Sequence, residues 1–288
     1  MKTTVSCAYC QIGTAMRLLK KFGLSEEEEQ KQFQKVLGYF ANCDYSMTPP
    51  ELHVPVWEIA RRASGQADPI KEERRKDNER VMALLPSIKK RVEESADPYL
   101  TAMKYAIAGN VIDPLPQHGV SVDEAFDAVL NKPLFIDHSA RLRQLLESGA
   151  KVLYVTDNAG EIVLDRLFLE TLFSLNITKP QNITLAVKGR PANNDATMED
   201  AAQVGLTGLV TVIDTGDDTM GITLSRSGGR FLEAFYGADV IVAKGMGNYE
   251  SLSDYREKLL CHMLMVKCEN VSGACGAPQG EFICMFNL

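Results

Sequence analysis

Short, continuous apolar runs alternate with helix-like segments through the second half of the chain, and this alternation constrains the fold more than any other feature. The runs span residues 152–155, 183–187, 210–213 and 240–243. Such runs are typical of strands buried on both faces, as in a parallel sheet covered by helices. We therefore expect an open α/β fold with a mostly parallel sheet flanked by helices, to which the segment GEFICMFN can add one more strand.

The first 130 residues show a different pattern. Apolar residues recur at helical spacing in TAMRLLKKFGL, KQFQKVLGYFA and VPVWEIARRAS, and no segment there has a convincing strand pattern. The stretch 67–98 carries dense mixed charge around a thin apolar stripe, which indicates solvent-exposed helices. The sequence thus predicts an all-helical subdomain over residues 1–130 and an α/β domain with the binding site over residues 131–288.

The composition limits the classes of partner. Of the 288 residues, 45% are hydrophobic and 24% are charged, which is ordinary for a soluble enzyme. The net charge of −7 argues against a surface built for nucleic acid or anionic lipid, since both require a positive patch. No signal peptide and no membrane-spanning apolar run is present, so we expect a cytoplasmic protein. The odd number of cysteines, seven, indicates reduced thiols.

Polar residues follow each of the four expected strands. The segments are Asp157-Asn158-Ala159-Gly160-Glu161, Lys188-Gly189-Arg190-Pro191 continuing to Asn193-Asn194-Asp195, Asp214-Thr215-Gly216-Asp217-Asp218, and Lys244-Gly245-Met246-Gly247-Asn248-Tyr249-Glu250. The carboxyl ends of parallel strands meet at one edge of the sheet, where open α/β folds bind their ligands. The sequence therefore predicts one polar site at this edge.

Three of these side chains have the chemistry of a hard-metal site. Carboxylate and amide oxygens are the ligands that Mg²⁺ or Mn²⁺ prefers, with positions left for water and phosphate. Asp157, Asn158 and Asp195 are the predicted metal ligands. Nearby glycines allow backbone N–H groups to approach phosphate oxygens, and Lys188 and Lys244 are expected to supply positive charge.

Each element also has a purely structural interpretation. Asp157-Asn158 and Asp195 are residue types that cap helices, and the acidic segment 214–218 is expected to be a solvated scaffold loop. The segment 245–250 lacks the third glycine of a dinucleotide loop, so a nucleotide cofactor is not expected. Cys7-Ala-Tyr-Cys10 has the spacing of half a zinc site or a redox pair, and equally of two buried helical thiols.

Five motifs in one order resemble the damage-control phosphatase family, also known as domain of unknown function 89, in its CxxC-bearing prokaryotic-type branch. They are Cys7-Ala-Tyr-Cys10, Gly109-Asn110-Val111-Ile112-Asp113, DNAGE, VKGRPANND and KGMGNYE. The resemblance implies a helical region against a Rossmann-like core. It also implies a phosphatase that uses a divalent metal ion (Mg, Mn, Co or Ni) to hydrolyse small phosphorylated metabolites, such as damaged or surplus sugar phosphates.

The same resemblance implies roles for individual residues. The metal ligands of the family, an adjacent Asp-Asn pair and a later Asp, fall on Asp157, Asn158 and Asp195. Its substrate-contacting residues fall on Gly247, Asn248, Glu250 and Lys267. Further pocket residues fall on Glu161, Lys188, Asn110 and Asp113.

Two other functions stay open from the sequence. One is S-adenosylmethionine-dependent carboxyl methyl transfer, associated with a eukaryotic branch of the family, although no glycine-rich turn follows the first expected strand here. The other is a non-catalytic metal or redox module centred on Cys7 and Cys10. For a phosphatase, we favour a metal-bound water as nucleophile over Asp157, because aspartyl-phosphate enzymes of the haloacid-dehalogenase type need a second Asp where this chain has Ala159.

Overall fold

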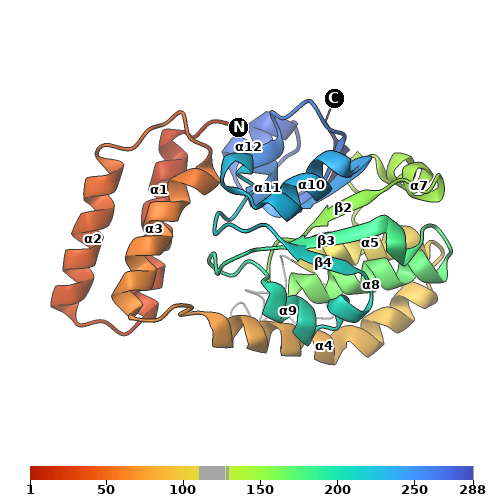
Figure 1. The fold of residues 1–288 in the computed structure, drawn as a ribbon, viewed down its shortest axis with the longest axis horizontal. Helices are drawn as coiled ribbons and strands as arrows, with labels where there is room; N and C mark the ends of the chain where they lie inside the picture. Colours follow the sequence, from red (N-terminus) through yellow and green to blue (C-terminus); the bar gives the residue numbers. More distant parts are fainter. Residues whose placement is uncertain (110–126, 128–129, 288) are drawn as a thin grey trace.

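The structure, a computed structural model, describes residues 1–109, 127 and 130–287 (Figure 1). Helices make up the first part of the chain. They are α1 (Val5–Lys21), α2 (Glu26–Phe40), α3 (Pro49–Ser64), α4 (Lys71–Glu93) and α5 (Pro98–Ala108). Local signals explain two of the starts, because Ser25 caps α2 and Thr48 forms a capping box with Glu51 at α3. No helix in the described part of the chain is long and apolar enough to cross a membrane.

A seven-stranded sheet forms the centre of the second part. Its strands are β1 (Ile136–Asp137), β2 (Val152–Val155), β3 (Ile183–Val187), β4 (Thr211–Asp214), β5 (Val240–Lys244), β6 (Leu260–Met265) and β7 (Phe282–Phe286), in the spatial order β1-β7-β6-β5-β2-β3-β4. All neighbouring pairs are parallel except β6 and β7. The expected mostly parallel sheet is confirmed, and the C-terminal segment adds the one antiparallel strand.

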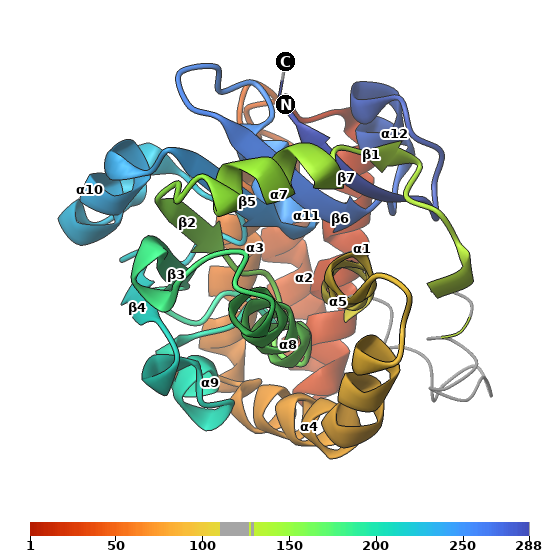
Figure 2. The same cartoon turned by 90° about the vertical axis from the view of Figure 1, so that its right-hand side faces the viewer.

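Helices cover both faces of this sheet (Figure 2). The helices of the second part are α7 (Ser139–Glu147), α8 (Glu161–Ser174), α9 (Met198–Gln203), α10 (Gly229–Gly237), α11 (Gly245–Leu252) and α12 (Glu269–Cys275). Val152 and Tyr154 of β2 pack into the core beneath α8, whereas Leu153 and Val155 pack into a second core beneath α10. Both faces of the strand are therefore buried, which explains why its sequence is continuously apolar.

Helices α4 and α5 take part in the packing of the sheet. Val81 and Ile88 of α4 and Met103 of α5 lie in the same core as Val152 and Tyr154. The expectation that segment 67–98 is a solvent-exposed surface is therefore wrong for one face of α4. The division of the chain at residue 130 stays a prediction.

Helices α1, α2 and α3 stand beside the α/β part and have small cores of their own (Figure 1). Leu52 and Val56 of α3 pack against Val36 of α2 in one of these cores. The indole N–H of Trp57 donates a 2.8 Å hydrogen bond to the carbonyl of Pro191, in the loop after β3. This bond ties the N-terminal helices to the carboxyl edge of the sheet.

Candidate active site

Two loops at the carboxyl edge of the sheet are joined by backbone pairing. Hydrogen bonds of 2.9 and 2.8 Å connect residues 157–159 to residues 194–196 and flank an antiparallel bridge between Asn158 and Asp195. In a bridge of this kind the paired Cα atoms lie about 4.5 Å apart and the two side chains leave from the same face. The fold thus brings Asn158 and Asp195 together, with Asp157 next to them.

The Asp157 carboxylate, at the end of β2, has close neighbours that limit its position. Its Oδ2 accepts a 2.7 Å hydrogen bond from Asn158 Nδ2, which also lies 3.5 Å from Glu161 Oε2. Gly245 also lies against this carboxylate. It has a φ of 76°, and a Cβ added to it would lie 1.9 Å from Asp157 Oδ2. Only glycine fits this contact, so Gly245 helps to set the position of the carboxylate.

Asp195 is a buried carboxylate whose one nearby cation is not hydrogen-bonded to it, among the described residues. It is 2% exposed, and its Oδ2 accepts no hydrogen bond within the described part of the molecule. Lys188 Nζ lies 3.5 Å from this oxygen but donates its 2.7 Å hydrogen bond to the carbonyl of Gly221. Burial raises the pKa of Asp195 well above its usual range; Lys188 opposes the shift and Asp157 adds to it. A buried carboxylate in this condition fits a bound cation.

The chemistry of the donors fits a hard cation. Asp157, Asn158 and Asp195 offer oxygen atoms only, as Mg²⁺ and Mn²⁺ prefer. Over the described residues, no group of three or more His, Cys, Asp or Glu side chains is arranged to hold a metal ion. The predicted ligands Asp157, Asn158 and Asp195 are not a group of this kind, because one of the three donors is the amide of Asn158. The prediction of two buried thiols at the CxxC motif is correct for Cys7, whereas Cys10 is exposed.

A buried ion cluster adjoins the end of β2. Lys244 Nζ donates hydrogen bonds of 2.6 Å to Glu161 Oε1, 2.6 Å to Asp165 Oδ1 and 2.8 Å to the carbonyl of Ala106. Burial raises the pKa of Glu161 to about 8, although Lys244 lowers it. Lys244 is fully buried, so the prediction that it supplies charge to a phosphate in the cleft is wrong. Its ammonium instead stabilises two buried carboxyl groups.

Helix α4 fixes the Asp157 loop through a buried amide. Asn78 Oδ1 accepts a 2.7 Å hydrogen bond from the N–H of Gly160, and its Nδ2 donates 2.9 Å to Asp200 Oδ1. Arg74, one turn earlier, donates 3.1 Å to Asp200 Oδ2. Sequence reasoning missed both residues. The available signal is an Asn in a helix interior, where it is unfavourable unless its side chain is bonded.

A cleft of about 580 Å³ opens between α1, α4 and the two loops. Asn158, Asn193 and Asn194 line it from the loops, and Lys267 lines it from the segment after β6. This volume is within the range of small-molecule sites. Since the cleft reaches a predicted metal ligand, it is the candidate substrate site.

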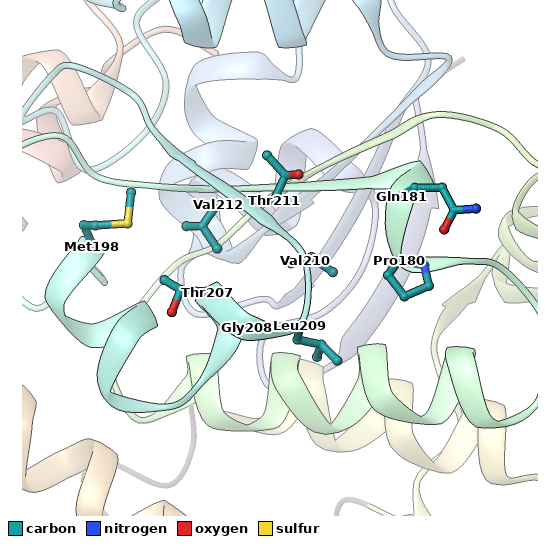
Figure 3. Close-up of a pocket in the computed structure, with 9 residues that line it drawn as sticks. All are labelled: Pro180, Gln181, Met198, Thr207, Gly208, Leu209, Val210, Thr211 and Val212. Atoms are coloured by element: carbon teal, nitrogen blue, oxygen red, sulfur yellow. The ribbon is translucent and has the colours of Figure 1, made fainter.

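A second hollow, of about 430 Å³, lies elsewhere (Figure 3). Pro180 and Gln181 line it just before β3, and Leu209 and Val210 just before β4. It is therefore at the amino ends of these strands. Ligands of open parallel sheets bind at the carboxyl ends, so we assign the active site to the first cleft.

The helix-cap interpretation of the predicted ligands is wrong. Helix α8 follows Gly160 without a side-chain cap, and α9 is capped by Thr197, which forms a capping box with Asp200. The acidic segment after β4 is also not simply solvated, because Asp217 is buried and accepts a 2.9 Å hydrogen bond from Arg226 Nε. That loop is part of the scaffold.

With this geometry in place, comparison with known proteins gives the family. The family model of the damage-control phosphatase ARMT1-like domain matches residues 3–283. The chain belongs to this family.

Several related proteins align with most of the length of this chain. A damage-control phosphatase of Archaeoglobus fulgidus is 33% identical over 291 residues, which span 98% of both chains. A damage-control phosphatase of Pyrococcus horikoshii is 34% identical over 224 residues, 77% of this chain and 76% of the relative. An uncharacterized protein of Methanocaldococcus jannaschii is 31% identical over 98% of this chain and 94% of its own.

A solved structure gives the same result for the fold. The crystal structure of a DUF89 family protein from Pyrococcus horikoshii matches with a TM-score of 0.90 and 29% identity, over the full length of both chains. The family and the fold expected from the five motifs are confirmed. The enzyme class named in the family description, a phosphatase, agrees with the expectation from the sequence.

The residues that the family resemblance assigned to substrate lie in different surroundings. Lys267 is exposed and lines the cleft. Glu250 is half-buried and lines a neighbouring cavity of about 320 Å³ together with Lys267 and both cysteines of the CxxC motif. Burial raises the pKa of Glu250 to about 7, with the N-terminal ammonium opposing the shift. Lys267 and Glu250 therefore remain predicted substrate contacts.

Asn248 and Gly247 lie in the first turns of α11, and neither lines the cleft. Asn248 is fully buried, and its Nδ2 donates 3.0 Å to the carbonyl of Thr156 and 2.7 Å to that of Lys244. It thereby joins the ends of β2 and β5. Gly247 packs closely on residues 220–221. Asn110 and Asp113 lie outside the described residues.

Proposed function

We propose that this protein is a phosphatase of small phosphorylated metabolites that needs a divalent cation bound by Asp157, Asn158 and Asp195. One observation carries the proposal: backbone pairing places Asn158 beside Asp195, whose buried Oδ2 accepts no hydrogen bond from the described residues. Family membership and the names of two relatives support the reaction class. Mg²⁺, Mn²⁺, Co²⁺ and Ni²⁺ are the cations to test.

The chain supplies a cation site and a positive charge for the phosphate. A cation at this site would screen the charge of the phosphoryl group and lower the pKa of a water molecule that attacks it. Asp157, Asn158 and Asp195 would hold the cation, and Lys267 in the cleft would bind the phosphate as a point charge. The Asp157 carboxylate is enclosed between Asn158 and Gly245, which favours a ligand with a fixed position over a nucleophile that must move to attack.

The substrate class follows from the cleft. A phosphate ester of a sugar or similar metabolite needs polar groups for its hydroxyls, and Asn193 and Asn194 lie on the lining. The net charge of −7 and the concave site argue for a small molecule rather than nucleic acid. We therefore propose sugar phosphates and related phosphoesters, including damaged or surplus ones, as substrates.

The test is phosphate release by purified protein that has been stripped of metal and then supplied with each cation separately. The substrates are p-nitrophenyl phosphate and a panel of sugar phosphates. We expect activity only with added metal, and its loss in Asp157→Ala and Asp195→Ala. Asp214→Ala is the matched control, because Asp214 is an exposed carboxylate at the end of the neighbouring strand β4. Activity that survives the Asp195 change, or no activity with any cation, contradicts the proposal.

A further inference from the structure

The cleft is larger than the reacting phosphate requires, and helix α1 forms one of its walls. Thr14, Arg17, Leu18 and Lys21 of α1 line the same cleft as Asn158. These residues recur at helical spacing, so one face of α1 is turned toward the cleft. A substrate whose phosphate lies near Asn158 therefore has its leaving group between that end and α1.

The charged groups that α1 and α4 turn toward the cleft differ in how far they are neutralised. Lys21 forms an ion pair with Glu73, which also lines the cleft. Arg74 is buried, and its guanidinium hydrogen-bonds the carboxylates of Asp68 and Asp200. Both cations thus already have carboxylate partners. A substrate anion would therefore have to compete with a carboxylate at each of these two cations.

Arg17 is in the opposite condition. Its side chain is exposed, and within the described residues its single hydrogen bond is the 2.9 Å contact from Nη2 to Thr14 Oγ1. Thr14 Oγ1 in turn donates 3.2 Å to the carbonyl of Cys10, which orients the pair along the helix. The guanidinium therefore has donors to spare in a fork that matches a carboxylate or phosphate group.

We propose that Arg17 binds a second anionic group on the leaving group of the substrate. The inference rests on the proposed function, and it narrows the substrate class to phosphate esters that carry another oxyanion, such as sugar bisphosphates or phosphorylated sugar acids. Arg17 acts as a specificity residue because it contacts the part of the substrate that does not react. The phosphoryl group itself lies near Asn158, which lines the cleft from the loop after β2 and not from α1.

The experiment compares kcat/KM for substrates with and without the second anion. The four substrates are a hexose bisphosphate, a phosphorylated hydroxy acid, a hexose monophosphate and p-nitrophenyl phosphate. Wild-type protein should prefer at least one of the first two over the hexose monophosphate by about tenfold or more, the size of a charged hydrogen bond. Which of the two it prefers distinguishes a phosphate from a carboxylate as the second group.

Variants at position 17 isolate the contact. Arg17→Gln should remove that preference through a higher KM and leave turnover of p-nitrophenyl phosphate unchanged, and Arg17→Lys should retain part of it. Lys20→Gln is the control, because Lys20 is an exposed cation of the same helix that does not line the cleft. Equal losses on all four substrates would place Arg17 at the reacting phosphate and overturn the inference, as would no wild-type preference. Absence of all activity in the wild type would instead contradict the proposed function.

Discussion

Replacement of Gly245 by Ala tests whether the position of the Asp157 carboxylate controls activity. The added Cβ would lie 1.9 Å from Oδ2 and 2.1 Å from Cγ of Asp157, so the carboxylate must retreat by about 1 Å before the contact becomes tolerable. Misplacement of a catalytic group by about 1 Å can cost roughly 100-fold in rate. We therefore expect kcat to fall by about two orders of magnitude, and half-activation to require a higher metal concentration.

A matched control separates this clash from backbone strain. Gly276 has the same φ of 76°, but an added Cβ there meets no atom within 4 Å. In both alanine variants the left-handed conformation lowers the free energy of unfolding by about 1–2 kcal/mol. Both should therefore unfold at a lower denaturant concentration than the wild type. Only Gly245→Ala should lose activity in the p-nitrophenyl phosphate assay. Wild-type turnover in Gly245→Ala, or an equal loss in Gly276→Ala, would refute the reasoning.

Three further changes probe the groups around the site. Asn78→Ala should lower the free energy of unfolding by about 1–3 kcal/mol in urea titrations, because the Gly160 N–H and Asp200 Oδ1 each lose a buried partner. Asp195→Asn should raise the Tm of metal-free protein and abolish the rise in Tm that added Mn²⁺ produces, since burial disfavours the charged carboxylate. Burial raises the pKa of Glu250 from 4.5 to about 7, so the folded protein holds this proton more tightly than the unfolded chain. The resulting contribution to the free energy of unfolding is complete below pH 4.5 and is lost as the pH rises through 7. The Tm of metal-free Glu250→Gln should therefore fall less than that of the wild type between pH 5 and 8.

The strands that carry the site were predictable because their environment repeats in the sequence. Strands β2, β3 and β5 are covered on both faces, so each is almost entirely apolar. Strand β6 escaped prediction although LCHMLM is nearly as apolar. His262 interrupts the run, yet it is fully buried with a pKa that burial lowers to about 3, and it behaves as a neutral core residue. This single histidine is therefore the reason that an interior strand of the sheet was not predicted.

The roles of ionisable residues were less predictable, because they depend on partners that are distant in the chain. In the sequence, Lys188 and Lys244 each come directly after an apolar run and directly before a glycine. The sequence pattern therefore predicts the same role for both. In the structure Lys188 pairs with Asp195 in the site, whereas Lys244 is enclosed between Glu161 and Asp165. The partners of Lys244 come from α8, and no local pattern reveals that this helix turns its first carboxylates inward.

The surroundings of the two lysines differ in a way that supports the proposed metal site. Lys244 donates hydrogen bonds to both Glu161 and Asp165, and burial raises the pKa of each of these carboxyl groups. Lys188 lies 3.5 Å from Asp195 but donates its hydrogen bond to a carbonyl, so no described group donates a hydrogen bond to Asp195 Oδ2. A divalent cation at the proposed site would favour the charged form of Asp195, and its binding free energy would add to the stability of the fold, by about 2.7 kcal/mol at 100 times its Kd. We therefore expect the buried carboxylate that weakens the metal-free protein to be the group that strengthens metal binding.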